Sequence, residues 1–152
     1  MPNPMTTLYI YLSGWRSRCM RFSNFDTREV GKRQNMLLVD FTYIDDVYGA
    51  ITATSGFITN YASLDKLKNL FLFVLYALLA GYGNKSSTIH DYLYNRGGYT
   101  DEQGVFHSVS RYEADRIFYR ALRAEGVAKW RAWIFYTGVR AFGSSRYLKP
   151  SE

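Results

Sequence analysis

Three side chains of types that enzymes use fall within about one helical turn, at His90, Asp91 and Tyr94. An imidazole can exchange a proton near neutral pH, a carboxylate can orient an imidazole or hold a cation, and a phenol can donate a hydrogen bond. Residues four apart share one face of a helix, so His90 and Tyr94 should point the same way, whereas Asp91 is turned by about 100°. One short helix would therefore present two chemical groups on two faces.

A second stretch offers a partner carboxylate for His90. Ser110 and Glu113 form the Ser-x-x-Glu pattern of a capping box, which predicts a helix start, and Asp115 follows beside the apolar stripe of that helix. If the two helices pack together, we predict that His90 and Asp115 lie within hydrogen-bond distance. The alternative interpretation is structural, because buried polar pairs also hold helices together without catalysis.

Histidine and carboxylate must be positioned by strands and helices, and the order of strand-forming runs followed by helices predicts an α+β fold with a small antiparallel sheet. We expect a single domain over residues 1–152. Strand-forming residues are concentrated in three runs of the first half, and the last two runs are separated by a break of hairpin length. These runs cover 8–12, 36–43 and 47–54. We expect irregular structure over 13–33 and a loop over 55–62.

Helices are expected in the second half of the chain. The His90 helix should be short, with Ser86 or Ser87 as its cap and with Gly97 and Gly98 at its end. Longer helices are predicted over about 64–80, where the apolar content indicates the most buried helix, from 110 to 126, and over about 128–142. The stripe of the second of these helices is Ala114, Ile117, Phe118, Ala121 and Leu122. We expect a protruding hairpin over 99–108.

Composition excludes several classes of protein. A hydrophobic fraction of 47% and an aromatic fraction of 18% exclude a disordered chain. Cys19 is the single cysteine, so no disulfide can form within the chain. The first residues lack the pattern of a signal peptide, and the longest apolar run, 70–80, is too short to cross a bilayer. We therefore expect a soluble protein made in the cytoplasm.

The formal net charge is +6, and most of the excess lies after residue 110. A basic surface can attract phosphate-bearing partners such as nucleic acid or anionic lipid. The sequence carries none of the patterns of known nucleic-acid modules, so we do not expect nucleic acid as a partner.

The ordered motifs Gly56-Phe57-x-Thr59-Asn60-x-Ala62-Ser63, His90-Asp91-x-Leu93-Tyr94 and Ser110-Arg111-x-x-Ala114-Asp115-x-x-Phe118 resemble a family of small, uncharacterised phage and prophage proteins. The resemblance covers roughly residues 37–143. It implies a phage origin and a structural or accessory protein of the virion, with the tail as its expected place. Its partners would be other virion proteins or further copies of the same chain, in the virion or the host cytoplasm.

The same pattern is similar to the core of secreted phospholipases A2, in which a His-Asp-x-x-Tyr helix faces an aspartate on a second helix. This resemblance implies that His90 deprotonates water, that Asp115 orients His90 and that Tyr94 bonds to Asp115. It also implies a membrane or envelope lipid as substrate and Asp91 as a calcium ligand.

The sequence departs from the phospholipase A2 pattern at the residues that would bind calcium. It has no glycine-rich calcium loop, and Asn60 stands where the phage family usually has an acidic residue. With Asp91 and Asn60 as the only candidate ligands, we expect no cofactor, or calcium bound only weakly.

Three functions remain open. We place a virion structural or accessory protein first, a phospholipase or esterase-type hydrolase that uses His90 and Asp115 second, and a factor that binds a host protein or nucleic acid third. His107 is a second imidazole, which we expect to be an ordinary surface residue of the hairpin. Nucleophile-elbow, phosphate-loop and dinucleotide motifs are missing from the sequence.

Overall fold

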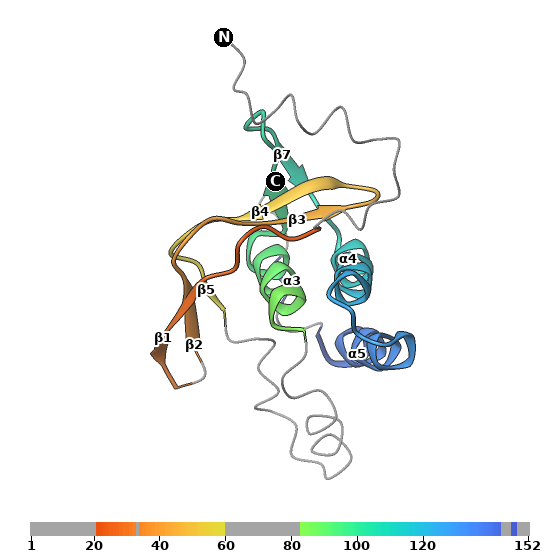
Figure 1. The fold of residues 1–152 in the computed structure, drawn as a ribbon. Helices are drawn as coiled ribbons and strands as arrows, with labels where there is room; N and C mark the ends of the chain where they lie inside the picture. Colours follow the sequence, from red (N-terminus) through yellow and green to blue (C-terminus); the bar gives the residue numbers. More distant parts are fainter. Residues whose placement is uncertain (1–20, 33, 60–82, 144–146, 149–152) are drawn as a thin grey trace, which may run out of the picture.

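A computed structural model describes residues 21–32, 34–59, 83–143 and 147–148, with only the backbone of residue 142. Strands precede helices, and one short hairpin separates the first two described helices (Figure 1). The strands are β1 (Thr27–Gly31), β2 (Gln34–Leu37), β3 (Phe41–Asp45), β4 (Gly49–Ala53), β5 (Ile58–Thr59), β6 (Gly98–Thr100) and β7 (Phe106–Ser108). The helices are α3 (Asn84–Arg96), α4 (Arg111–Ala124) and α5 (Lys129–Phe142). The α+β fold class is confirmed.

The described strands form three small antiparallel sheets, in the orders β1-β2-β5, β3-β4 and β6-β7. The β3–β4 hairpin lies across the ends of α3 and α4 (Figure 1). Phe41, Tyr43 and Asp45 are buried in alternation along β3, because successive side chains of a strand point to opposite faces. This hairpin therefore covers one end of the helix pair and shares its core.

α4 packs between α3 and α5. Its expected stripe is confirmed, since all five side chains are buried: Ala114, Ile117, Phe118, Ala121 and Leu122. The capping box is also confirmed, with the Ser110 side chain accepting from the Glu113 N–H and the Glu113 side chain accepting from the Ser110 N–H. Helix α5 and the β6–β7 hairpin lie where the sequence predicts them.

The start of α3 differs from the expectation. The helix is 13 residues long rather than short, its first cap is Gly83 at φ +81°, and no side chain of its own caps it. Glu125, from the link between α4 and α5, accepts hydrogen bonds from the Ser86 N–H at 3.0 Å and the Ser86 hydroxyl at 2.5 Å. A carboxylate from another element thus satisfies a free N–H group in the first turn of α3, and neither Ser86 nor Ser87 is the cap of the helix.

The strand boundaries also need correction. The run 36–43 is one uninterrupted pattern in sequence but divides into β2 and β3, which belong to different sheets. The bend between them is held by Asp40, whose carboxylate accepts from the Ser55 N–H at 2.7 Å. β1 lies in the stretch expected to be irregular and β5 in the expected loop, because pairing with β2 on both sides decides their conformation. The expected strand over 8–12 and helix over 64–80 lie outside the described residues.

None of the helices in the described part of the chain is long and apolar enough to cross a membrane.

Candidate functional site

Helices α3 and α4 bring together the three residues predicted from sequence to form a site. The Nε2 atom of His90 lies 3.0 Å from Oδ1 of Asp115, which confirms the predicted hydrogen bond. The hydroxyl of Tyr94, one turn after His90, donates to the same oxygen at 2.6 Å. All three side chains are buried, and Asp115 is fully so. The 3.6-residue period of α3 thus aims an imidazole and a phenol at one carboxylate of the neighbouring helix.

The second oxygen of Asp115 faces two arginines. Arg140 of α5 donates from Nη1 to Oδ2 at 3.0 Å, and Nε of Arg111 lies 4.0 Å from the same atom. Arg111 also donates to the carbonyl oxygens of Val139 and Arg140 near the end of α5. Arg111 is four residues before Asp115, a spacing that signals a helical pair. Arg140 had no signal in the sequence, because it reaches Asp115 from another helix.

These contacts keep Asp115 ionised. Burial alone raises the pKa of its carboxyl group, but hydrogen bonds from His90 and Tyr94 and the pair with Arg140 outweigh burial and leave the pKa below its usual value. Burial and the hydrogen bond to Asp115 raise the pKa of the Tyr94 hydroxyl, so this phenol stays protonated and donates. The Asp115 carboxylate therefore accepts from His90, Tyr94 and Arg140.

His90 is held in an aromatic environment. Its ring centroid lies 4.1 Å from that of Tyr94 and 4.6 Å from that of Phe118. Because an ionised Asp115 accepts at Nε2, the neutral imidazole carries its hydrogen there and a lone pair at Nδ1. Nδ1 is buried and has no hydrogen-bond partner within the described structure. Asp115 thus fixes one nitrogen of His90, and the other nitrogen, an acceptor in the neutral imidazole, has no partner among the described residues.

Asp91 does not join this cluster. It lies on another side of α3, where its Oδ2 accepts from the Thr59 hydroxyl of β5 at 2.7 Å. Asn60, the other candidate calcium ligand, lies outside the described residues. Among the residues that are described, no three His, Cys, Asp or Glu side chains are close enough to hold a metal ion. The described residues around Asp91 therefore supply no group of three such ligands, and weak calcium binding stays a prediction.

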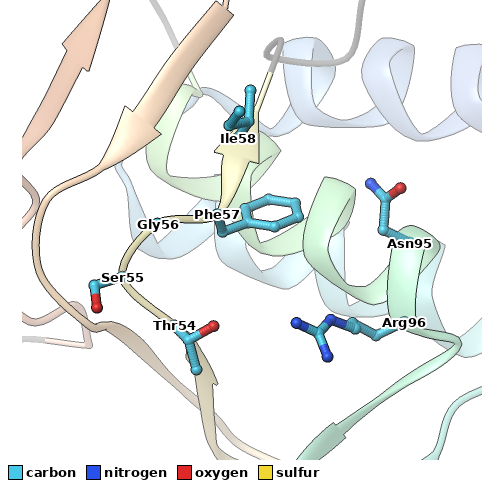
Figure 2. Close-up of a pocket in the computed structure, with 7 residues that line it drawn as sticks. All are labelled: Thr54, Ser55, Gly56, Phe57, Ile58, Asn95 and Arg96. Atoms are coloured by element: carbon cyan, nitrogen blue, oxygen red, sulfur yellow. The ribbon is translucent and has the colours of Figure 1, made fainter. Parts of the chain in front are cut away.

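An open pocket of about 470 Å³ lies at the C-terminal end of α3 (Figure 2). It is bounded by Asn95 and Arg96 of α3 and by the segment that joins β4 to β5, which contributes Thr54, Ser55, Gly56, Phe57 and Ile58. Phe57 packs against Tyr92 at 5.3 Å between ring centroids. Neither His90 nor Asp115 lines this pocket, so the pocket and the hydrogen-bonded cluster are separate features.

The second histidine is exposed in the β6–β7 hairpin, as expected. It is more ordered than an ordinary surface residue, because Nε2 of His107 lies 2.6 Å from Oδ2 of Asp101 and its ring stacks on Tyr99. The hydrogen bond to His107 holds the pKa of the Asp101 carboxyl below its usual value. No buried network surrounds this pair.

Fold and site together define an α+β protein whose adjacent helices share a buried histidine–aspartate pair. The chain belongs to the family described as "Protein of unknown function (DUF1353)", whose model matches residues 35–139, more than half of the chain. The match spans all of the clustered residues except Arg140, which lies one residue beyond it. Comparison with curated proteins and with solved structures gives no match.

Proposed function

We propose that the protein is an ester hydrolase of the phospholipase A2 type, in which His90 is the general base. The observation that carries this proposal is that Nδ1 of His90 has no hydrogen-bond partner among the described residues, while Asp115 holds the other ring nitrogen in place. A buried acceptor without a partner costs stability, so a purely structural network would be expected to satisfy it. A general base needs such a free lone pair, held in a fixed direction.

In the proposed reaction, Nδ1 of His90 removes a proton from a water molecule while the water oxygen bonds to the ester carbonyl carbon. The tetrahedral intermediate then collapses, its carbon–oxygen bond to the alcohol breaks, and the imidazolium returns the proton to the leaving oxygen. Asp115 stabilises the imidazolium through Nε2 without taking the proton. Tyr94 and Arg140 hold the carboxylate in the orientation that His90 requires.

A second candidate is the structural or accessory virion protein that the resemblance to phage proteins implies. The observation that favours it is the use of both Asp115 oxygens. One oxygen binds α3 through His90 and Tyr94, and the other binds α5 through Arg140. In this interpretation the cluster stabilises the packing of three helices. That stabilisation exceeds the free energy that is lost because Nδ1 of His90 has no partner among the described residues.

Substitution of His90 separates the two proposals. We expect the wild-type protein to hydrolyse phospholipid vesicles or a short-chain chromogenic ester, and His90→Ala to lower kcat by about a hundredfold or more, the usual contribution of a general base. His107→Ala is the matched control, since it removes the other imidazole, which is exposed. It should leave kcat unchanged.

Asp115→Asn keeps the shape of the side chain and tests the same point through the partner of His90. If His90 is a base, this variant loses activity, and the pH dependence of the remaining rate changes. Hydrolysis that survives in both His90→Ala and Asp115→Asn would exclude the proposed base. Absence of hydrolysis in the wild type, with both substitutions lowering only the melting temperature, would favour the virion protein.

A further inference from the structure

The pocket at the C-terminal end of α3 has one wall whose shape is fixed by backbone hydrogen bonds. The chain makes a tight turn here, in which the Phe57 N–H donates to the Thr54 carbonyl at 3.2 Å. Gly56, the third residue of the turn, has φ +82°, a conformation that glycine adopts without strain. The N–H groups of Ser55 and Gly56 donate to the bend after β2 and to the end of β2. The turn is therefore a preformed surface for a ligand.

The opposite wall carries an exposed guanidinium, that of Arg96. Arg96 follows Tyr92 by about one helical turn, and its guanidinium lies 5.7 Å from the Tyr92 ring centroid. Within the residues that the structure describes, no carboxylate lies within ion-pair distance of Arg96. Figure 2 shows the Arg96 side chain reaching from α3 toward the turn, where the Thr54 hydroxyl is on the side that faces the helix. A cation and a hydroxyl thus face the same space.

Neither of the carboxylates bonded to these walls lines the pocket. Asp40 is bonded to the backbone of the turn, and Asp91 to the Thr59 hydroxyl of β5. The end of a helix carries negative partial charge on its last carbonyl groups, but those of Leu93 and Tyr94 already accept backbone N–H groups. The described lining therefore has one full positive charge and no full negative charge.

We propose that this pocket binds a small monocarboxylate with an apolar body. The planar guanidinium of Arg96 matches a carboxylate through two parallel hydrogen bonds, and one positive charge balances one negative charge. Phe57 is partly buried and Ile58 is 50% exposed, so both offer apolar surface to the rest of the ligand. The volume of about 470 Å³ lies within the range of small-ligand sites. His90 and Asp115 do not line the pocket, so this inference stands whether or not His90 is a catalytic base.

Titration of the isotope-labelled full chain with phenylacetate, followed by NMR, tests the proposal. We expect a dissociation constant of about 1 mM or below, as for a ligand of this size, and amide shifts concentrated on 54–58 and 95–96. Phenylacetamide has the same shape without the charge and should bind about tenfold more weakly or less. Phenyl phosphate should also bind more weakly than phenylacetate, because its second negative charge has no partner in the lining.

Substitution of Arg96 tests the site itself. Arg96→Ala should lower the affinity for phenylacetate by about tenfold or more, and Arg96→Lys should give an intermediate affinity, because lysine keeps the charge without the planar fork. Arg116→Ala is the matched control. Arg116 is also exposed, follows Tyr112 by four residues and lies 5.7 Å from its ring centroid, but it is on α4 outside this pocket. Its substitution should leave the affinity unchanged.

Circular dichroism and melting temperature establish that each variant is folded. Absence of phenylacetate binding, shifts confined to other parts of the chain, or equal affinity for phenylacetamide would overturn the proposal. So would an affinity that is equal in the wild type and Arg96→Ala, or that falls equally in Arg96→Ala and Arg116→Ala. Tighter binding of phenyl phosphate than of phenylacetate would overturn the assignment of a monocarboxylate, since the pocket would then select a phosphate group.

Discussion

The hydroxyl of Tyr94 has little freedom in the cluster. It donates to Asp115 at 2.6 Å, and Nε of Arg111 donates to it at 3.4 Å. The backbone at the end of α5 closes its remaining side, because a Cβ atom built on Gly143 would lie 2.8 Å from that hydroxyl oxygen. The fit of Tyr94 into the cluster therefore depends on a residue without a side chain.

We predict that Gly143→Ala displaces the Tyr94 hydroxyl and lowers stability by about 1–3 kcal/mol, the usual cost of forcing an extra methyl group into a packed site. Urea unfolding measures this change. The matched control is Gly138→Ala, inside α5, where an added Cβ meets nothing within 4 Å and φ is ordinary. This control should be neutral or more stable, since alanine favours a helix. Equal destabilisation by both substitutions would show that the contact with Tyr94 is unimportant.

Among the elements, α3 depends most on a residue from outside itself. Its backbone begins at Gly83 in the left-handed region, and Glu125 supplies the carboxylate that a capping side chain would normally provide. The same carboxylate fixes the link between α4 and α5 against α3. Position and stability of the His90 helix are therefore coupled to the end of α4.

We expect Glu125→Ala to lower the free energy of unfolding by about 1–2 kcal/mol, as for loss of a good helix cap. The Ser86 hydroxyl and N–H would lose their acceptor, so the first turn of α3 should show faster amide hydrogen exchange. Glu102→Ala, at an exposed position of the β6–β7 turn, removes a similar carboxylate and should change neither quantity. Unchanged exchange in the Glu125 variant would mean that the α3 start does not rely on this contact.

At the scale of the whole molecule, an ion pair between Asp45 and Arg120 joins the β3–β4 hairpin to helix α4. Asp45 ends β3, and its carboxylate accepts from Arg120 of α4 at 2.8 and 3.0 Å and from the Val47 and Tyr48 N–H groups. Burial by itself raises the pKa of Asp45, but the bonds from Arg120 and from the turn outweigh burial and lower it. The ionised form is therefore the one that stabilises the fold.

Because the pKa of Asp45 is lower in the folded protein, Asp45 stabilises the fold less as the pH becomes acidic. The contribution of Asp45 is fully present above the unfolded value of 3.8 and is lost as the pH falls toward the lower pKa of the folded protein. We predict that Asp45→Asn destabilises the protein by about 3 kcal/mol at neutral pH, since it leaves Arg120 without its carboxylate. The difference from the wild type should narrow below about pH 4. Melting temperatures from pH 7 to pH 3 measure it, and a difference that stays constant would contradict the role of ionisation.

The sequence by itself determined the helical features that depend on local pattern. The capping box at Ser110, the apolar stripe of α4 and the end of α3 at Gly97 follow from side chains and backbone preferences within a few residues. Helical period also placed His90 and Tyr94 on one face of α3. Their contact with Asp115 was expected only if the two helices packed together, and the bond from Tyr94 to Asp115 was implied by the resemblance to phospholipases A2. The catalytic role of that site stays a prediction.

Contacts between distant segments decided the rest, and no local pattern could show them. Pairing with β2 turns 27–31 and 58–59 into strands, and the bend held by Asp40 divides a continuous strand-forming run. Arg140 joins the Asp115 cluster from α5, and Glu125 caps a helix 40 residues away in sequence, so both roles exist only after the helices have packed. Hydrogen bonds and ion pairs of this kind depend on distance in space, which the order of residues along the chain does not specify.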